Sequence, residues 1–237
     1  MAIMSGLPDR RSVDEAGAEV LPLPDGVSEL LPQRGIARGT ILGCSGARSL
    51  LVAVIATITR AGGQVGIVGL PWLNLLAAAE MGADLDRVAV VADPGIDPVE
   101  VAAVLLDGMD LVVLGLRGTP VPPSRGRVIG GRARQAASVL LVVDGDWPGV
   151  HAHLRARVLG YRQVPAATTA DLGAARSGYG RVAGMRLRVV AEGRDRRRRS
   201  IELDLVAGGG GDRPPVRLVP ADTAIAAPSP AGTAVAN

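Results

Sequence analysis

Short apolar runs alternate with helix-like stretches between residues 40 and 143, and this rhythm constrains the fold more than any other feature of the sequence. Apolar runs of four or five residues are typical of parallel strands buried on both faces, and the stretches between them supply helical crossovers. The pattern predicts strands at 40–42, 64–68, 88–91, 111–114 and 139–143. It predicts helices at 49–60, 73–81, 98–107 and 128–137. We therefore expect an α/β fold with a mainly parallel sheet flanked by helices.

The two ends of the chain follow different patterns. Ser12 and Glu15 have the spacing of a capping box and predict a short helix, followed by a helical turn at 27–31. Beyond residue 144 the sequence predicts a further helix, a linker of small residues and an antiparallel hairpin. These elements fall at 147–157, at 166–180, and at 185–191 with 200–206.

The resulting domain organisation has three parts. Residues 1–28 form an N-terminal segment with a short helix, and residues 29–207 form the α/β domain with its C-terminal hairpin. Residues 208–237 are rich in Gly, Pro and Ala and are expected to be a mobile tail.

The single cysteine, Cys44, excludes an intramolecular disulfide and is typical of a reducing compartment, so we expect a cytoplasmic protein. A thiol before a helix can be reactive, but a semi-buried small residue is the favoured interpretation of Cys44. The longest apolar stretch, residues 49–59, is too short to cross a bilayer, and no membrane partner is expected. His151 and His153 have no further ligand at zinc spacing, so we expect surface histidines and no metal.

A glycine-containing run lies between the first predicted strand and the first predicted helix. Such a turn can hold nucleotide phosphates, because unpaired amides and the helix dipole face the anion. The phosphate-loop motif Gly-x-x-x-x-Gly-Lys-Ser/Thr retains its hydroxyl at Ser49, but Leu42, Ala47 and Arg48 replace its two glycines and its lysine. A planar guanidinium fits the lysine position poorly. We interpret the run as a degenerate, vestigial nucleotide site formed by Gly43, Cys44, Ser45, Gly46, Ala47, Arg48 and Ser49, and expect no cofactor, ATP included.

Residues 31–143 resemble the RecA recombinase core, and more closely its truncated relatives of the ImuA and SulA type, above all the actinobacterial ImuA-prime variant. The lead-in Leu-Pro-Gln-Arg-Gly-Ile-Ala-Arg-Gly-Thr-Ile at 31–41 and the segment Ala-Glu-Met-Gly-Ala-Asp-Leu-Asp-Arg-Val at 79–88 carry the likeness. So do Asp-Leu-Val-Val-Leu-Gly at 110–115 and Arg-Ala-Arg-Gln-Ala-Ala-Ser-Val-Leu-Leu-Val-Val at 132–143. The resemblance implies a RecA-like P-loop core.

The departures from that family concern its chemistry. Leu114 and Gly115 stand where RecA has a magnesium-binding aspartate, and 69–71 (Gly-Leu-Pro) replaces the acidic residue that polarises the attacking water. With Arg48, these changes remove the groups that position and stabilise a phosphoryl-transfer transition state. We therefore expect no catalytic residues and no ATPase activity.

The basic character of the chain is concentrated in residues 151–199, where 12 arginines face three acids, a balance of +9. Three interpretations of the predicted hairpin tip stay open: contact with DNA phosphates, docking on an acidic protein, and a solvated turn. With two Trp, two Tyr and no Phe in the chain, DNA contact would be electrostatic, without base stacking. The tip residues are Arg194, Arg196, Arg197, Arg198 and Arg199.

The resemblance implies an adaptor in damage-induced mutagenesis, that is, in the translesion synthesis of an SOS response. Its implied partners are an ImuB-type, catalytically inactive relative of Y-family polymerases and, indirectly, an error-prone replicative-type DNA polymerase. Trp147 and Leu154 are candidates for the apolar centre of the partner interface, although Trp147 can also pack on the chain's own sheet. The alternatives are a weakly active DNA-linked ATPase and a SulA-like inhibitor of cell division.

Overall fold

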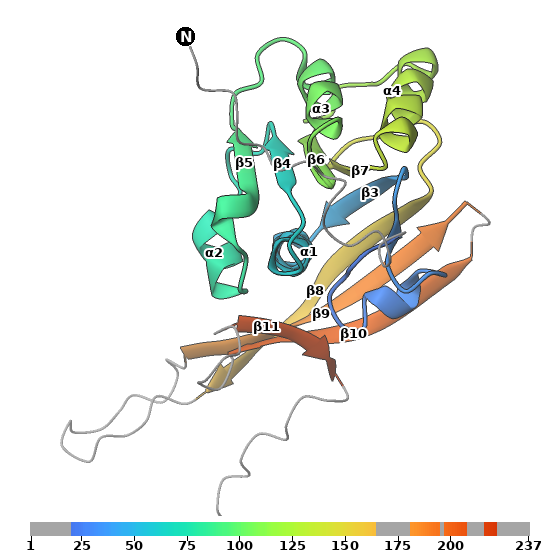
Figure 1. The fold of residues 1–237 in the computed structure, drawn as a ribbon. Helices are drawn as coiled ribbons and strands as arrows, with labels where there is room; N and C mark the ends of the chain where they lie inside the picture. Colours follow the sequence, from blue (N-terminus) through green and yellow to red (C-terminus); the bar gives the residue numbers. More distant parts are fainter. Residues whose placement is uncertain (1–19, 165–180, 195–196, 208–215, 222–237) are drawn as a thin grey trace, which may run out of the picture.

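The structure is a computed structural model and describes residues 20–164, 181–194, 197–207 and 216–221. Within these residues nine strands form one sheet in the order β11-β10-β9-β8-β3-β7-β6-β4-β5 (Figure 1). Its strands are β3 (Ile41–Gly46), β4 (Val65–Val68), β5 (Val88–Val91), β6 (Leu111–Gly115), β7 (Val139–Val143), β8 (Ala152–Val164), β9 (Arg181–Gly193), β10 (Arg198–Ala207) and β11 (Val216–Pro220). A separate antiparallel pair joins β1 (Val20–Leu21) to β2 (Ile36–Ala37).

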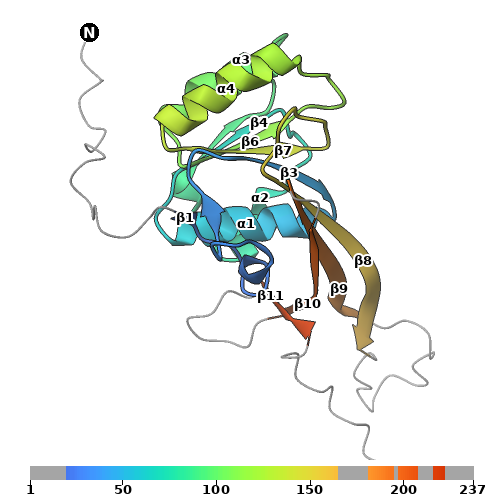
Figure 2. The ribbon, with the colours of Figure 1, turned by 90° about the vertical axis from the view of Figure 1, so that its right-hand side faces the viewer.

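The half of the sheet from β5 to β3 is parallel and lies between two layers of helices. The helices α1 (Arg48–Arg60) and α2 (Leu75–Glu80) pack on one face. The helices α3 (Pro98–Leu106) and α4 (Pro123–Gln135) pack on the other (Figure 2). Along β7, Leu141 and Val143 face α1 while Leu140 and Val142 face α3 and α4, so every position of that strand is apolar and buried. This arrangement confirms the predicted α/β class.

The C-terminal half of the sheet is built differently. β8 runs parallel to β3, and β9, β10 and β11 follow it as an antiparallel series. The predicted hairpin is confirmed, with Val189 opposite Ile201. The helix predicted at 147–157 is wrong, because β8 occupies most of that range. Alternation of Leu154 and Ala156, which are buried, with Arg155 and Arg157, which are exposed, is the period-two pattern of a strand.

Residues 20–31 pack against the far end of the sheet. Leu21 and Val27 belong to the core beneath α1, and the predicted helical turn is present as a 3-10 helix, η1 (Ser28–Leu30). The backbone at Gly26 lies so close to β10 and β11 that a Cβ atom there would be 2.9 Å from Ile201 and 3.3 Å from Pro220. The segment therefore joins the first described residues to the last described strand.

Two of the predicted domain boundaries differ from those in the structure. Residues 20–28 share the core of the α/β domain. The mobile tail predicted from residue 208 is wrong for Val216–Pro220, which forms β11 and pairs with β10. Three predicted parts of the chain lie outside the described residues: the helix at Ser12 and Glu15, the linker at 166–180, and the tail apart from residues 216–221. In the described parts of the chain, no helix is long and apolar enough to cross a membrane.

Candidate functional site

The junction between β3 and α1, where the nucleotide loop was expected, contains almost no loop. β3 continues through Gly46, and Ala47 alone separates it from α1. The turn predicted from Gly43 onward is therefore wrong for 43–46. These residues are held in the sheet by β8, with Gly43 opposite His153 and Gly46 opposite Ala156. A strand paired in this way cannot wrap around a phosphate group.

The backbone of β8 occupies the end of the junction. The Ala47 amide donates a hydrogen bond of 2.8 Å to the Ala156 carbonyl oxygen. Gly46 has φ +92°, and a Cβ atom there would lie 2.0 Å from the same oxygen. Glycine at this position thus serves the close contact between two strands. The amide of Ala47, which a phosphate loop would offer to its ligand, is already used within the fold.

His153 covers the other side of β3. A Cβ atom at Gly43 would lie 2.3 Å from its Nδ1, and its Nε2 is 3.0 Å from the Ser45 hydroxyl oxygen. Burial, reinforced by the positive charge of Arg155, lowers the pKa of His153 and favours the neutral imidazole. The Ile41 amide donates to Nδ1 of His151 at 3.3 Å. Both histidines are partly buried beside β3, so their expected surface position is wrong.

The two residues that open α1, Arg48 and Ser49, differ in their contacts. The Arg48 guanidinium lies 4.2 Å from the centroid of the Trp72 ring, which is the geometry of a cation–π contact. The Ser49 hydroxyl oxygen is buried and has no hydrogen-bond partner among the described residues. Arg48 therefore stacks on the loop after β4, although it stands in the lysine position of the phosphate-loop motif.

The positions that would carry acidic residues are closed by packing. A Cβ atom at Gly115 would lie 2.4 Å from Leu70 and 2.8 Å from the Gly69 carbonyl oxygen, and Leu114 is fully buried. An aspartate at Gly115 would therefore require Leu70 and the chain around it to move. Cys44 is buried as well; burial, and secondarily the charge of Asp144, raises the pKa of its thiol to about 12. This environment supports the inert interpretation of Cys44.

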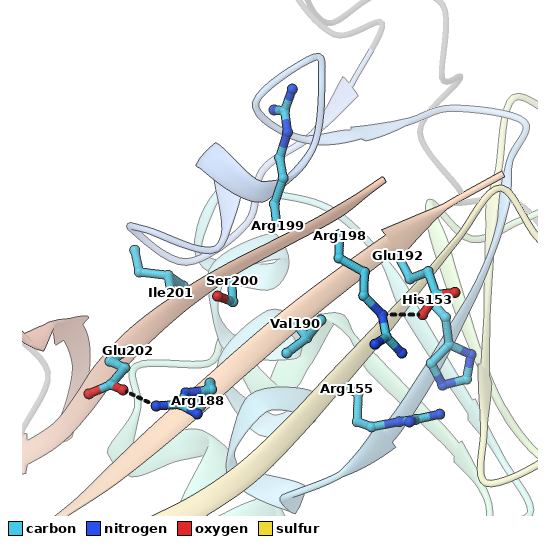
Figure 3. Close-up of a pocket in the computed structure, with 10 residues that line it drawn as sticks. All are labelled: His153, Arg155, Arg188, Val190, Glu192, Arg198, Arg199, Ser200, Ile201 and Glu202. Carbon is cyan, nitrogen blue, oxygen red and sulfur yellow. Dashed lines mark hydrogen bonds and ion pairs between the residues drawn. The ribbon is translucent and has the colours of Figure 1, made fainter. Parts of the chain in front are cut away.

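The arginines of the predicted hairpin tip point in different directions. Arg194 donates hydrogen bonds to the carbonyl oxygens of Gly149, at 2.6 Å, and Val150, at 3.2 Å, so it ties the end of β9 to the loop before β8. Arg198 pairs with Glu192 at 2.9 Å. Figure 3 shows Arg199 pointing away from that pair.

Arg197 is exposed beside these residues, and Arg196 lies outside the described residues. The five arginines predicted as one DNA or partner contact are therefore not gathered into one described cluster.

A larger charged surface lies on the strands themselves. The side of β8, β9 and β10 that faces away from α1 lines a shallow pocket of about 450 Å³ (Figure 3). We call this surface the arginine face. Cross-strand register and hydrogen bonding assign to it His153, Arg155, Arg157, Arg162, Arg186, Arg188, Val190, Glu192, Arg198, Ser200, Glu202 and Asp204.

The acids of the arginine face each hold an arginine in place. Arg188 contacts Glu202 at 2.6 Å, across the strands. Asp204, with a side chain only 2% exposed, accepts hydrogen bonds from Arg162 and Arg186 at 2.9 Å each. The hydrogen bond from Arg186 is the largest of the effects that hold the pKa of Asp204 below its usual value, against the opposing effect of burial.

Sequence reasoning missed the arginine face because residues 147–157 were interpreted as a helix, which scatters Arg155 and Arg157 over different sides. The period-two alternation was the signal that could have revealed it. Trp147 and Leu154, the predicted centre of a partner interface, are 6% and 0% exposed. Trp147 packs with α4 and Leu154 with the core beneath α1, so neither presents a surface to a partner in this structure.

A mainly parallel sheet between two helical layers, continued by the antiparallel strands β9 to β11, defines a RecA-like fold. The RadB recombinase shows the same fold: its structure has a TM-score of 0.51 at 14% sequence identity, over 77% of this chain and 94% of that chain. A KaiC-like protein from the archaeon Pyrococcus horikoshii OT3 has a TM-score of 0.49 at 12% identity, over 85% of this chain and 96% of that chain.

The chain belongs to the MT3502 N-terminal domain family, which matches residues 29–149. It is also 50% identical over 187 residues to Uncharacterized protein Rv3395c of Mycobacterium tuberculosis (strain ATCC 25618 / H37Rv). That similarity covers 78% of this chain and 90% of the relative. The family match ends just before β8, so the strands of the arginine face follow the matched region.

Proposed function

We propose that this chain is a non-catalytic RecA-like adaptor in damage-induced mutagenesis. In this role it binds an ImuB-type, catalytically inactive relative of Y-family polymerases, which in turn engages an error-prone replicative-type polymerase. The observation that carries the proposal is the pairing of β8 with β3 as far as Gly46, which replaces a phosphate loop by sheet. The implied partners come from the resemblance of residues 31–143 to ImuA-type proteins.

The packing around the junction supports the absence of turnover. Phosphoryl transfer needs a cradle for the phosphates, a compact cation and a metal-holding carboxylate. In this chain Ala47 donates its amide to β8, Arg48 stacks on Trp72, and Gly115 has no room for a side chain. Restoring one group would leave the other two missing. The fold then serves as a scaffold for binding.

The experiment is co-purification of the full chain with an ImuB-type protein, alongside an ATP titration and an ATPase assay with and without single-stranded DNA. We expect a stable complex, no ATP binding and no hydrolysis above background. Magnesium-dependent turnover that Ser49→Ala abolishes would establish the ATPase alternative. Filamentous cells on overexpression, without complex formation, would support the division-inhibitor alternative.

A truncated chain that ends at Asp144 cannot be used to locate the partner interface. It lacks β8 to β11, and Leu154, Leu187 and Leu203 of these strands belong to the same core as α1. Such a truncation would expose that core to water and lose stability for reasons unrelated to a partner. Point variants of exposed residues are the appropriate tool.

A further inference from the structure

The arginine face is the side of the sheet that the described helices leave uncovered. On this side the apolar cluster of α3 and α4 reaches Ile41 of β3 and includes no residue of β8, β9 or β10. Figure 2 shows these three strands extending past the layer formed by α3 and α4. The opposite side of the same strands is packed beneath α1, with Leu154, Leu187 and Leu203 fully buried. Among the described residues, no helical layer covers this side of β8, β9 and β10.

The charges of the arginine face are not balanced within the described residues. Glu192 and Glu202 each pair with one arginine of the neighbouring strand, and Asp204 holds two. Arg155 and Arg157 on β8 are exposed and have no hydrogen bond or ion pair among the described residues. They lie two residues apart on one side of the strand, which separates their Cα atoms by about 6.7 Å. Two available guanidinium groups therefore stand beside a set of already oriented ones.

The chemistry of this surface selects the kind of occupant. An amphipathic helix with an apolar face is a poor fit, because Val190 and Ile201 are the apolar residues among those described around the pocket and the others are charged or polar. A nucleic-acid strand is disfavoured by the carboxylates interleaved with the arginines, and among the described residues that line the pocket there is no Trp, Tyr or Phe on which bases could stack. Carboxylates of a protein segment can bind guanidinium groups in bidentate pairs, and its cationic or polar residues can face Glu192 and Glu202.

We propose that the arginine face is the docking surface for an acidic segment of a protein partner, with Arg155 and Arg157 as the residues that take its carboxylates. Arg188 and Arg198, oriented by Glu202 and Glu192, line the pocket together with Arg155, and Arg157 lies opposite Arg188 on the neighbouring strand. An extended segment with acids at every second residue matches the spacing along β8, since its own side chains repeat at about 6.7 Å. This inference rests on the proposed function, because an adaptor must bind a protein partner. It adds which surface of this chain binds the partner and that the bound segment is acidic.

The test measures binding of a fluorescein-labelled peptide of alternating Glu and Ala to the full chain by fluorescence anisotropy at low salt. The variant Arg155→Gln/Arg157→Gln is expected to bind about tenfold more weakly, because two charge-assisted contacts are lost. The matched control is Arg127→Gln/Arg134→Gln, which removes the same charge from exposed positions of α4 and should bind like wild type. Circular dichroism verifies that each variant is folded.

Equal weakening in both variants, or no weakening in Arg155→Gln/Arg157→Gln, would overturn the proposal. So would a peptide that fails to bind while duplex DNA binds through Arg155 and Arg157, an outcome that would assign the face to nucleic acid. Co-purification separates this inference from the proposed function. If the ImuB-type protein binds wild type and Arg155→Gln/Arg157→Gln equally, the proposed docking surface is wrong and the adaptor function is supported. If the peptide binds as expected but wild type binds no ImuB-type protein, the docking surface is supported and the adaptor function is wrong.

Discussion

The imidazole of His153 lies directly over Gly43, so close that a Cβ atom at Gly43 would be 2.3 Å from the ring nitrogen Nδ1. The two residues are register partners on β8 and β3. A second contact, from Nε2 of His153 to the Ser45 hydroxyl, holds the ring in this position. Position 43 must therefore be glycine because the His153 side chain, more than 100 residues later in the sequence, fills the space that a Cβ atom would need. This contact explains the glycine without a phosphate ligand.

Gly43→Ala should lower the free energy of unfolding by about 1–3 kcal/mol, because the added methyl group overpacks the space filled by His153. Urea denaturation measures the change. In a His153→Ala background the same substitution should cost much less, and this double-mutant cycle isolates the contact. Gly131→Ala on α4 is the control. It meets no atom within 4 Å and should gain about 0.5–1 kcal/mol from its helical position. Equal costs of Gly43→Ala in both backgrounds would contradict the steric explanation.

Restoring two residues of the phosphate-loop motif should not restore nucleotide binding. In Ala47→Gly/Arg48→Lys the backbone of β8 still accepts the hydrogen bond from residue 47 and still borders Gly46. We expect no heat of ATP–magnesium binding by isothermal titration calorimetry, with an active RecA-like ATPase as the positive control. Binding of ATP by this variant would show that residue identity at 47 and 48, and not the path of β8, closes the site.

Asp204→Asn should destabilise the sheet by about 1–2 kcal/mol near neutral pH, because it removes the carboxylate that accepts from Arg162 and Arg186. The figure allows for solvent screening of the partly exposed guanidinium groups. The pKa of Asp204 is lower in the folded chain than in the unfolded chain. Its contribution is therefore complete above the unfolded pKa of about 3.9 and disappears as the pH falls through the folded value.

Urea denaturation of wild type and Asp204→Asn at a series of pH values checks this. The difference in unfolding free energy between them should stay constant from pH 7 to about 5 and shrink below about pH 4. A difference that does not change with pH would mean that packing, and not the carboxylate charge, accounts for the effect of the substitution.

The Cys44 thiol should resist alkylation in the native protein. With a pKa raised to about 12 by burial, its thiolate fraction at pH 8 is on the order of a thousandfold below that of an exposed cysteine. Mass spectrometry after iodoacetamide treatment measures the rate, and the chain unfolded in urea provides the comparison. Cys44→Ala gives the background. Labelling of native and unfolded chains at equal rates would show that the junction between β3 and α1 opens readily.

The parallel half of the fold could be predicted because its strands are apolar on both sides. Val88–Val91 and Val139–Val143 occupy the ranges that their composition indicated. In Val139–Val143 burial on both faces leaves no alternation for the sequence to misplace, and the 13-residue helices α1 and α4 are long enough to show their own period. α4 begins at Pro123, earlier than predicted, because proline is favoured at the first helical position.

The candidate site could not be predicted in the same way, because contacts distant in sequence determine it. Gly43, Ser45 and Gly46 have the composition of a turn. Gly43 is strand because it pairs with both β7 and β8, and Ser45 and Gly46 because they pair with β8. Arg155 and Arg157 lie in a stretch whose helical and strand patterns compete over a few residues. Packing across the sheet decides between them, and local propensity contains no information about that packing.

The contact of residues 20–31 with β10 and β11 has a consequence for synthesis. Gly26 lies against Ile201, Leu203 and Pro220, so the segment that leaves the ribosome early docks on strands made near the end of translation. At typical elongation rates the interval is on the order of ten seconds or more. During that time Val27 and Leu30 have no finished surface to cover, and the nascent chain carries exposed apolar groups that invite aggregation or chaperone binding. Slowing elongation should lengthen that vulnerable interval, while a protein refolded from denaturant does not pass through it.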